Sequence, residues 1–197
     1  MILIRILIIL SFALIQKTSD NPGKRIIYNE DFDQSFLDLD YWNYELGDGC
    51  PELCGWGNKE YQHYTKENVF VRDEKLVIKA TKIGDQYFSG RITTKDKMEF
   101  QYGTVEVKAK LPIGLGVWPA IWMLGTSIGN NWHPTTIGWP GCGEIDIMEH
   151  WGNYPNVIHG STHTISSNGA TINTSQVKRE DIFDDWHVYS VNWSPNQ

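Results

Sequence analysis

Residues 143–150 read GEIDIMEH, and this stretch sets the expected fold class. Side chains of an extended strand point alternately to opposite faces, so Glu144 and Asp146 share one face and the two isoleucines share the other. Strict alternation would place Glu149 with the isoleucines. One extra residue, a β-bulge near residues 147–148, would return Glu149 to the acidic face. We therefore predict a bulged, half-buried strand with three carboxylates on one face.

Short β-type runs continue on both sides of this strand, and no long helical period is present. Residues 75–80 (KLVIKA) and 105–110 (VEVKAK) show the alternation of strands. The loop expected at residues 125–143 is long for a compact domain, which is typical of functional loops. An antiparallel all-β sandwich or barrel is the architecture that such spacing favours. The expected strands are residues 25–28, 69–71, 75–81, 90–94, 102–110, 118–124, 144–148, 157–163 and 186–193.

Three carboxylates on one strand face need an explanation, because like charges at neighbouring positions destabilise a sheet. A solvated acidic face, or one that binds a cation, is one explanation. Glycoside hydrolysis is another, since a retaining enzyme needs two carboxyl groups roughly 5–5.5 Å apart. The Cα atoms of Glu144 and Glu149 lie up to roughly 16 Å apart on a strand, and a bulge shortens that span. Asp146 between them can hold their pKa values apart. The spacing permits retention and leaves inversion open.

Composition and net charge indicate which classes of partner the chain can bind. The chain has 197 residues, enough for one domain, and a net charge of −7, which argues against nucleic acid. Nine Trp, nine Tyr and seven Phe suit a cleft that stacks on sugar rings, although core packing explains most of them. No zinc pattern or phosphate-binding loop is present.

The N-terminus predicts secretion. Arg5 precedes an apolar run at residues 6–15, which has the length of a signal-peptide core; the alternative is an uncleaved anchor. We expect residues 1–18 to be a signal peptide with an undefined cleavage site, and the mature chain not to bind membranes. Cys50 and Cys54 could close a small disulfide loop, which leaves Cys142 as a free thiol.

Residues 143–150 resemble the active-site strand of family-16 glycoside hydrolases, in the bulged E-x-D-x-x-E form that is typical of laminarinases, agarases and carrageenases; the last two act on galactans, which are sulfated in carrageenan. The resemblance extends over residues 25–197, which we expect to form the catalytic domain. Other stretches that match the family are GWGNKEYQHYT (55–65), SGRITT (89–94), YGTVEV (102–107), Pro112, GVWPAIWML (116–124) and HGSTH (159–163).

The resemblance implies a concanavalin A-like β-jelly-roll sandwich with a concave substrate cleft. It implies that Glu144 is the nucleophile, that Asp146 is its helper and that Glu149 is the acid/base. Substrate-binding roles are implied for Asn58, Arg91, Trp118, Trp122, Trp139 and His163. Lys59 departs from the family, which commonly has Asn there.

The implied function is endo-acting, retaining hydrolysis of β-1,3-glucan. The alternatives are a non-catalytic β-glucan-recognition protein, against which the three retained carboxylates argue, and a glucan transglycosylase. No cofactor is expected. Many relatives hold a structural calcium, here near Glu30 and at an acidic residue beyond Gln197, so no metal site is expected in this chain. We further expect a secreted monomer that lacks the C-terminal part of its domain, so that the strand at residues 186–193 has no partner.

Overall fold

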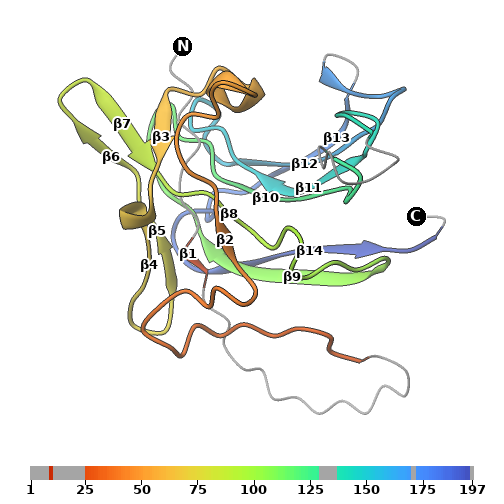
Figure 1. Ribbon diagram of the computed structural model, residues 1–197, viewed down its shortest axis with the longest axis horizontal. Helices are drawn as coiled ribbons and strands as arrows, with labels where there is room; N and C mark the ends of the chain where they lie inside the picture. The colour runs from red at the N-terminus through yellow and green to blue at the C-terminus, as the bar shows by residue number, and fades with distance from the viewer. Residues whose placement is uncertain (1–8, 11–24, 129–136, 170–171, 196–197) are drawn as a thin grey trace.

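A computed structural model describes residues 9–10, 25–128, 137–169 and 172–195 (Figure 1). Within them the fold is built from strands and two single-turn 3-10 helices, η1 (Cys54–Gly57) and η2 (Lys66–Asn68). None of the helices in these ranges is long and apolar enough to cross a membrane. The strands are β1 (Ile9–Leu10), β2 (Asn43–Tyr44), β3 (Gln62–Tyr64), β4 (Val69–Val71), β5 (Leu76–Ile78), β6 (Thr81–Ile83), β7 (Gln86–Ser89), β8 (Ile92–Thr93), β9 (Gly103–Lys110), β10 (Ala120–Leu124), β11 (Glu144–Glu149), β12 (Val157–His163), β13 (Asn173–Lys178) and β14 (His187–Trp193).

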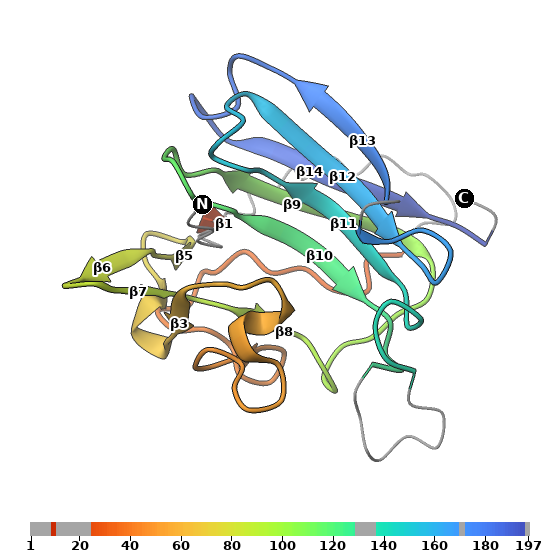
Figure 2. The same ribbon diagram turned by 90° about the horizontal axis from the view of Figure 1, so that it is seen from above.

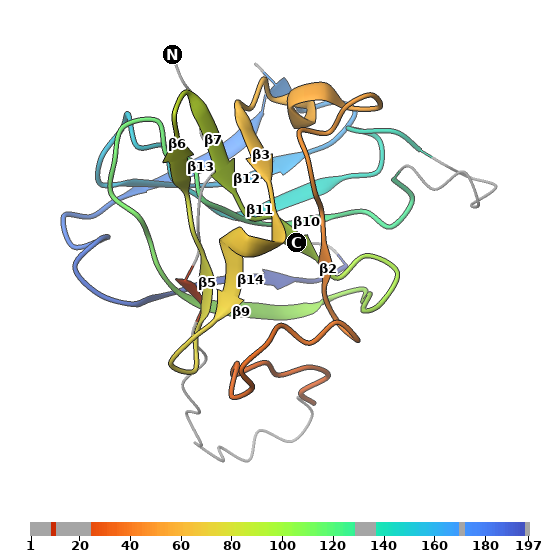
Figure 3. The same ribbon diagram turned by 60° about the vertical axis from the view of Figure 1, so that its left-hand side comes forward.

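Two sheets form the body of the molecule. One has the order β10-β11-β12-β13, and these strands run side by side in Figure 2. The other has the order β14-β9-β1-β5-β4. Figures 1 and 3 both show β10–β12 in one layer and β9 with β14 in the other. This two-layer architecture confirms the expected all-β sandwich.

The core lies between the two layers. Met148 of β11, Leu76 of β5 and Ala109 of β9 are each 0% exposed and belong to one buried apolar cluster. Burying apolar side chains from both sheets is the main force that holds the layers together. The face of the first sheet that points away from this cluster is therefore available for chemistry.

Several strand predictions need correction. Residues 25–28 form no strand, and residues 75–81 divide between β5 and β6. β13 was not predicted, because its residues are polar and all exposed, so they show no alternation. β3 and β7 pair in parallel within an otherwise antiparallel fold.

The expectation that the last strand would lack a partner is wrong. β14 pairs antiparallel with β9 along all seven of its residues, from His187 opposite Ala109 to Trp193 opposite Gly103. Its partner precedes it in the sequence. At the N-terminus, Ile9 and Leu10 form β1 between β5 and β9. The other residues of the expected leader lie outside the described ranges, so the signal peptide stays a prediction.

Candidate active site

Strand β11 carries the bulge that its sequence predicts. Against β10, the single step from Ile121 to Trp122 spans two steps of β11, from Met148 to Asp146. Against β12, the register also shifts between Asp146 and Glu149. The extra residue turns Met148 into the core, where it is 0% exposed, and returns Glu149 to the side of Asp146. We call the sheet face that bears Glu144, Asp146 and Glu149 the carboxylate face.

The two glutamates each accept a hydrogen bond from a tryptophan outside β11. The indole Nε1 of Trp118, just before β10, donates to Glu149 Oε1 at 2.7 Å. The indole Nε1 of Trp139, in the loop before β11, donates to Glu144 Oε2 at 2.6 Å. An indole nitrogen only donates, so in each contact the carboxyl oxygen is the acceptor. Glu149 is 4% exposed, and a carboxylate so deeply buried needs such partners.

Asp146 interacts with a histidine from the neighbouring strand. His163 Nε2 lies 3.0 Å from Asp146 Oδ2, and Asp146 is 4% exposed. His163 is also the register partner of Glu144, and its ring centroid lies 5.5 Å from that of Trp139. His163 therefore links the middle carboxylate of the strand to the tryptophan that holds Glu144. Its Nδ1 is buried and has no hydrogen-bond partner among the described residues.

Arg91 joins the carboxylate face to the loop that precedes β3. Its Nε is ion-paired with Glu45 Oε2, and both side chains are largely buried. Its guanidinium lies 4.3 Å from the ring centroid of Trp56 and 4.9 Å from that of Trp122. Both distances are in the cation–π range. Trp122 is the register partner of Asp146, so this stack of side chains reaches the centre of the site.

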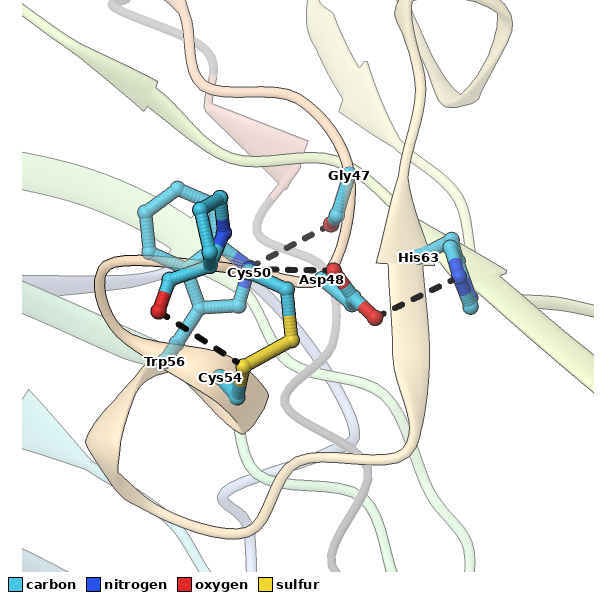
Figure 4. Close-up of a disulfide and its surroundings, with 7 residues drawn as sticks. Gly47, Asp48, Cys50, Cys54, Trp56 and His63 are labelled. Atoms are coloured by element: carbon cyan, nitrogen blue, oxygen red, sulfur yellow. Dashed lines mark hydrogen bonds and ion pairs between the residues drawn. A yellow bond between two sulfur atoms is a disulfide. The ribbon is translucent and has the colours of Figure 1, made fainter.

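The disulfide predicted between Cys50 and Cys54 is formed, and it closes a small loop that ends two residues before Trp56 (Figure 4). Asp48 Oδ1 accepts a hydrogen bond from the backbone N of Cys50 at 3.1 Å. The indole of Trp56 donates to Gly47 O at 3.3 Å. The disulfide and these two hydrogen bonds thus hold residues 47–56 in place. This segment in turn holds the Trp56 ring against Arg91. Cys142 is a free thiol, as expected.

Asn58 belongs to a buried polar group at the start of β3. Its Nδ2 donates to Glu60 Oε1 at 3.2 Å, while Tyr64 Oη donates to Glu60 Oε2 at 2.6 Å. Gln62 Nε2 donates to the same Glu60 oxygen at 2.9 Å. Burial, followed by the charge of Glu60, raises the pKa of Tyr64 well above its usual range. Asn58 is therefore held in place by the protein, and its contact with substrate stays a prediction.

Three residues near the site were not singled out from the sequence: Trp56, Trp151 and His159. His159 is the register partner of Glu149, and its ring centroid lies 4.1 Å from that of Trp151. Trp151 follows Glu149 by two residues and His159 precedes His163 by four, so alternation could have placed each on the carboxylate face. For Trp56, the only feature of the sequence that indicates a place near the site is its position in the GWGN stretch.

Burial shifts the titration of three groups beside the carboxylates. It lowers the pKa of His150, and it lowers that of His159, where the nearby His150 contributes further. It raises the pKa of the Cys142 thiol, and the charge of Glu144 adds to that shift. Neutral imidazoles and a neutral thiol therefore surround the acidic strand at neutral pH.

No three His, Cys, Asp or Glu side chains gather in a metal-binding arrangement in the described parts of the chain. Glu30, near which calcium was considered, accepts hydrogen bonds from Tyr28 Oη at 3.1 Å and from the backbone N of Phe32 at 2.9 Å. Both of its oxygens thus have protein donors. The expectation that this chain holds no metal site stays untested.

Comparison with known proteins shows clear relatives. The model of the glycosyl hydrolases family 16 matches residues 57–197. The chain is 39% identical over 193 residues to glucan endo-1,3-beta-glucosidase A1 of Niallia circulans, covering 87% of this chain and 27% of that protein. It is 36% identical over 206 residues to the beta-glucanase of Rhodothermus marinus, covering 99% of this chain and 68% of that protein. The chain thus spans about a quarter of the first relative's length and about two thirds of the second's.

A solved structure agrees with these matches. The laminarinase of Flavobacterium sp. UMI-01 superimposes with a TM-score of 0.81 at 50% identity, covering 87% of this chain and 71% of that one. The expected jelly-roll sandwich is confirmed by this likeness.

Proposed function

Because the chain belongs to glycosyl hydrolase family 16, we propose that it is an endo-acting, retaining hydrolase of the β-1,3 bonds in laminarin-like glucans. The observation that carries the proposal is the carboxylate face. Three acidic side chains share one face of a bulged strand, and each has its own hydrogen-bond partner. Structural strands have no need of such an arrangement, whereas a double-displacement hydrolase does.

In this mechanism Glu144 is the nucleophile and Glu149 the acid/base. Glu149 donates its proton to the leaving glycosidic oxygen while a Glu144 oxygen forms a bond to the anomeric carbon. The ionised Glu149 then takes a proton from water, which attacks that carbon and releases Glu144. The hydrogen bond from Trp139 fixes one oxygen of Glu144 and so orients the proposed nucleophile. Two inversions at the anomeric carbon give net retention.

Asp146 is proposed as the helper of the two glutamates. It lies between them on the strand and is oriented by His163. Its carboxyl group lies next to both glutamates on the strand, where it can support their different roles. Trp118, Trp122 and Trp139 offer aromatic surface for sugar rings beside these groups.

A neutral glucan fits the electrostatics better than a sulfated galactan. The chain carries a net charge of −7, and Arg91, the cation that contacts Trp122, is already paired with Glu45. A polyanionic substrate would meet repulsion from the carboxylates with little compensation. The two curated relatives named above act on glucans by their names, which supports the same choice.

We propose that the protein acts outside the cell, on the strength of the apolar run at residues 6–15. We further propose that it is a monomer. A signal peptide of residues 1–18 would be removed on export, and β1 (Ile9–Leu10) would be removed with it. The test is to express the full chain with its native N-terminus and to sequence the N-terminus of the protein in the medium. Recovery only in the membrane fraction would favour an uncleaved anchor.

Product analysis tests the reaction itself. Laminarin should yield mainly oligosaccharides, and NMR of a fresh digest should show the β-anomer first. Initial release of the α-anomer would mean inversion, with Glu144 acting as a base. Binding of laminarin without any turnover would favour a recognition protein, and transfer to added oligosaccharides in place of hydrolysis would favour a transglycosylase.

Two variants test the roles of the glutamates. Glu144→Ala should lose nearly all turnover on every substrate. Glu149→Ala should still form the glycosyl-enzyme from an aryl glycoside with an activated leaving group and then stall, because no base remains. Added azide should relieve the stall and give a β-glycosyl azide. Equal loss on laminarin and aryl glycoside in Glu149→Ala, without azide rescue, would contradict the acid/base role.

A further inference from the structure

The carboxylate face continues beyond the end of β11 through a pair of tryptophans. The backbone N of His150 donates to Pro119 O at 3.1 Å, and that of Gly152 donates to Val117 O at 2.9 Å. These bonds flank Trp118 on one side and Trp151 on the other, so the two residues oppose each other across the extended β10–β11 ladder. Side chains of opposed residues in antiparallel strands lie on the same face.

Close backbone approach makes this extension rigid. A Cβ atom at Gly152 would lie 1.8 Å from Gly114 O and 2.8 Å from a methyl carbon of Val117. Only glycine permits the loop before β10 to lie this near. The backbone of Trp118 is therefore held in place by these contacts. The orientation of its indole ring depends on the side chains that the ring contacts.

The rings of Trp118, Trp151 and His159 contact one another in series beside Glu149. Trp118 and Trp151 make an edge contact, with centroids 6.1 Å apart and planes at 84°. Trp151 lies 4.1 Å from His159 at 31°, and His159 is the register partner of Glu149. At one end of this series, the Trp118 indole donates its hydrogen bond to Glu149 Oε1.

Buried polar atoms show that these rings act by packing. Trp151 Nε1 and His159 Nε2 are both buried without a hydrogen-bond partner in the described part of the chain. Buried indoles usually have such a partner. Trp151 is thus held by ring contacts with Trp118, His159 and Tyr154 (6.2 Å).

We propose that Trp151 is a positioning residue for general acid catalysis: it holds the Trp118 indole, which in turn holds the Glu149 carboxyl group in the direction of the leaving oxygen. The inference rests on the proposed function, since it requires Glu149 to be the acid/base. A proton donor must keep its geometry to be effective, and loss of a support that does not touch the substrate lowers the rate through misplacement.

The alternative is that Trp151 merely stabilises the fold, and the leaving group separates the two roles. A purely structural loss lowers the concentration of active enzyme and reduces the rates of all substrates by one factor. Loss of acid positioning affects laminarin, whose leaving sugar must be protonated. It spares an aryl glycoside with an activated leaving group, which departs unprotonated.

The experiment compares kcat/KM of wild type, Trp151→Phe and Trp151→Ala on laminarin and on 2,4-dinitrophenyl β-laminaribioside. For a double displacement, kcat/KM reports formation of the glycosyl-enzyme, the step that uses the acid. We expect a loss of roughly 5–20-fold on laminarin and less than about 2-fold on the aryl glycoside. The ratio of the two values does not depend on the fraction of folded enzyme, so poor folding leaves the test intact.

Trp193→Phe is the matched control, because Trp193 lies on β14 in the other sheet and packs on Tyr102. Its ratio should equal that of wild type. Equal losses on both substrates in the Trp151 variants would overturn the inference. Glu149→Ala in the same assay separates failure of the positioning role from failure of the proposed function. If Glu149→Ala loses more kcat/KM on laminarin than on the aryl glycoside and Trp151→Phe does not, only the positioning role of Trp151 fails. If Glu149→Ala loses equally on both substrates, the proposed function fails.

Discussion

Replacing the proposed nucleophile Glu144 by glutamine should stabilise the protein while removing its activity. Glu144 and Asp146 are two residues apart on one strand face, so about 6.7 Å of strand rise separates them. At an effective dielectric constant of about 20, two charges at that distance repel by roughly 2.5 kcal/mol. The contact of Asp146 with His163 and the solvent at half-exposed Glu144 reduce this value. Glutamine can still accept the Trp139 hydrogen bond, so we expect a net gain of about 1 kcal/mol.

Denaturation with urea and thermal unfolding at pH 7 measure this gain. A chain of this size should show a rise in Tm of about 2–4 °C per kcal/mol. Glu106→Gln on the exposed side of β9 changes the net charge equally, and we expect it to leave stability within the usual surface range. Lower stability of Glu144→Gln, or an equal gain in the control, would refute the repulsion argument.

Three further outcomes follow from the contacts described above. Burial lowers the pKa of His150 and His159, so the unfolded state binds protons more readily. The free energy of unfolding should therefore fall as pH drops below about 6.5 and level off below the folded pKa; a flat urea profile from pH 8 to 5 would contradict this. The double variant Cys50→Ser/Cys54→Ser should lose at most about 2 kcal/mol, because the closed loop is short, as chemical denaturation can show. Arg91→Lys removes a planar cation from between two tryptophans and should raise KM for laminarin by about 5–10-fold with little change in kcat; an unchanged KM would argue against that role.

The acidic strand could be predicted from the sequence because its pattern is local. Alternation of Glu144 and Asp146 with isoleucines is a property of any extended chain. The bulge also follows locally, since burying Met148 and grouping Glu149 with the other carboxylates require one extra residue. The disulfide between Cys50 and Cys54 was likewise within reach, because so few residues separate the two thiols.

Contacts between distant segments were decided by the tertiary structure. β13 is polar and fully exposed, so its sequence lacks the alternation that predicts a strand. β14 pairs with β9, which lies far earlier in the chain. The partners of the carboxylates come from other elements: Trp118 lies 31 residues before Glu149, and His163 lies 17 residues after Asp146. A local pattern shows which face a side chain occupies, but which strands become neighbours depends on burying the apolar faces of both sheets together. That global packing brings Trp118 and His163 within hydrogen-bond distance of their carboxylates.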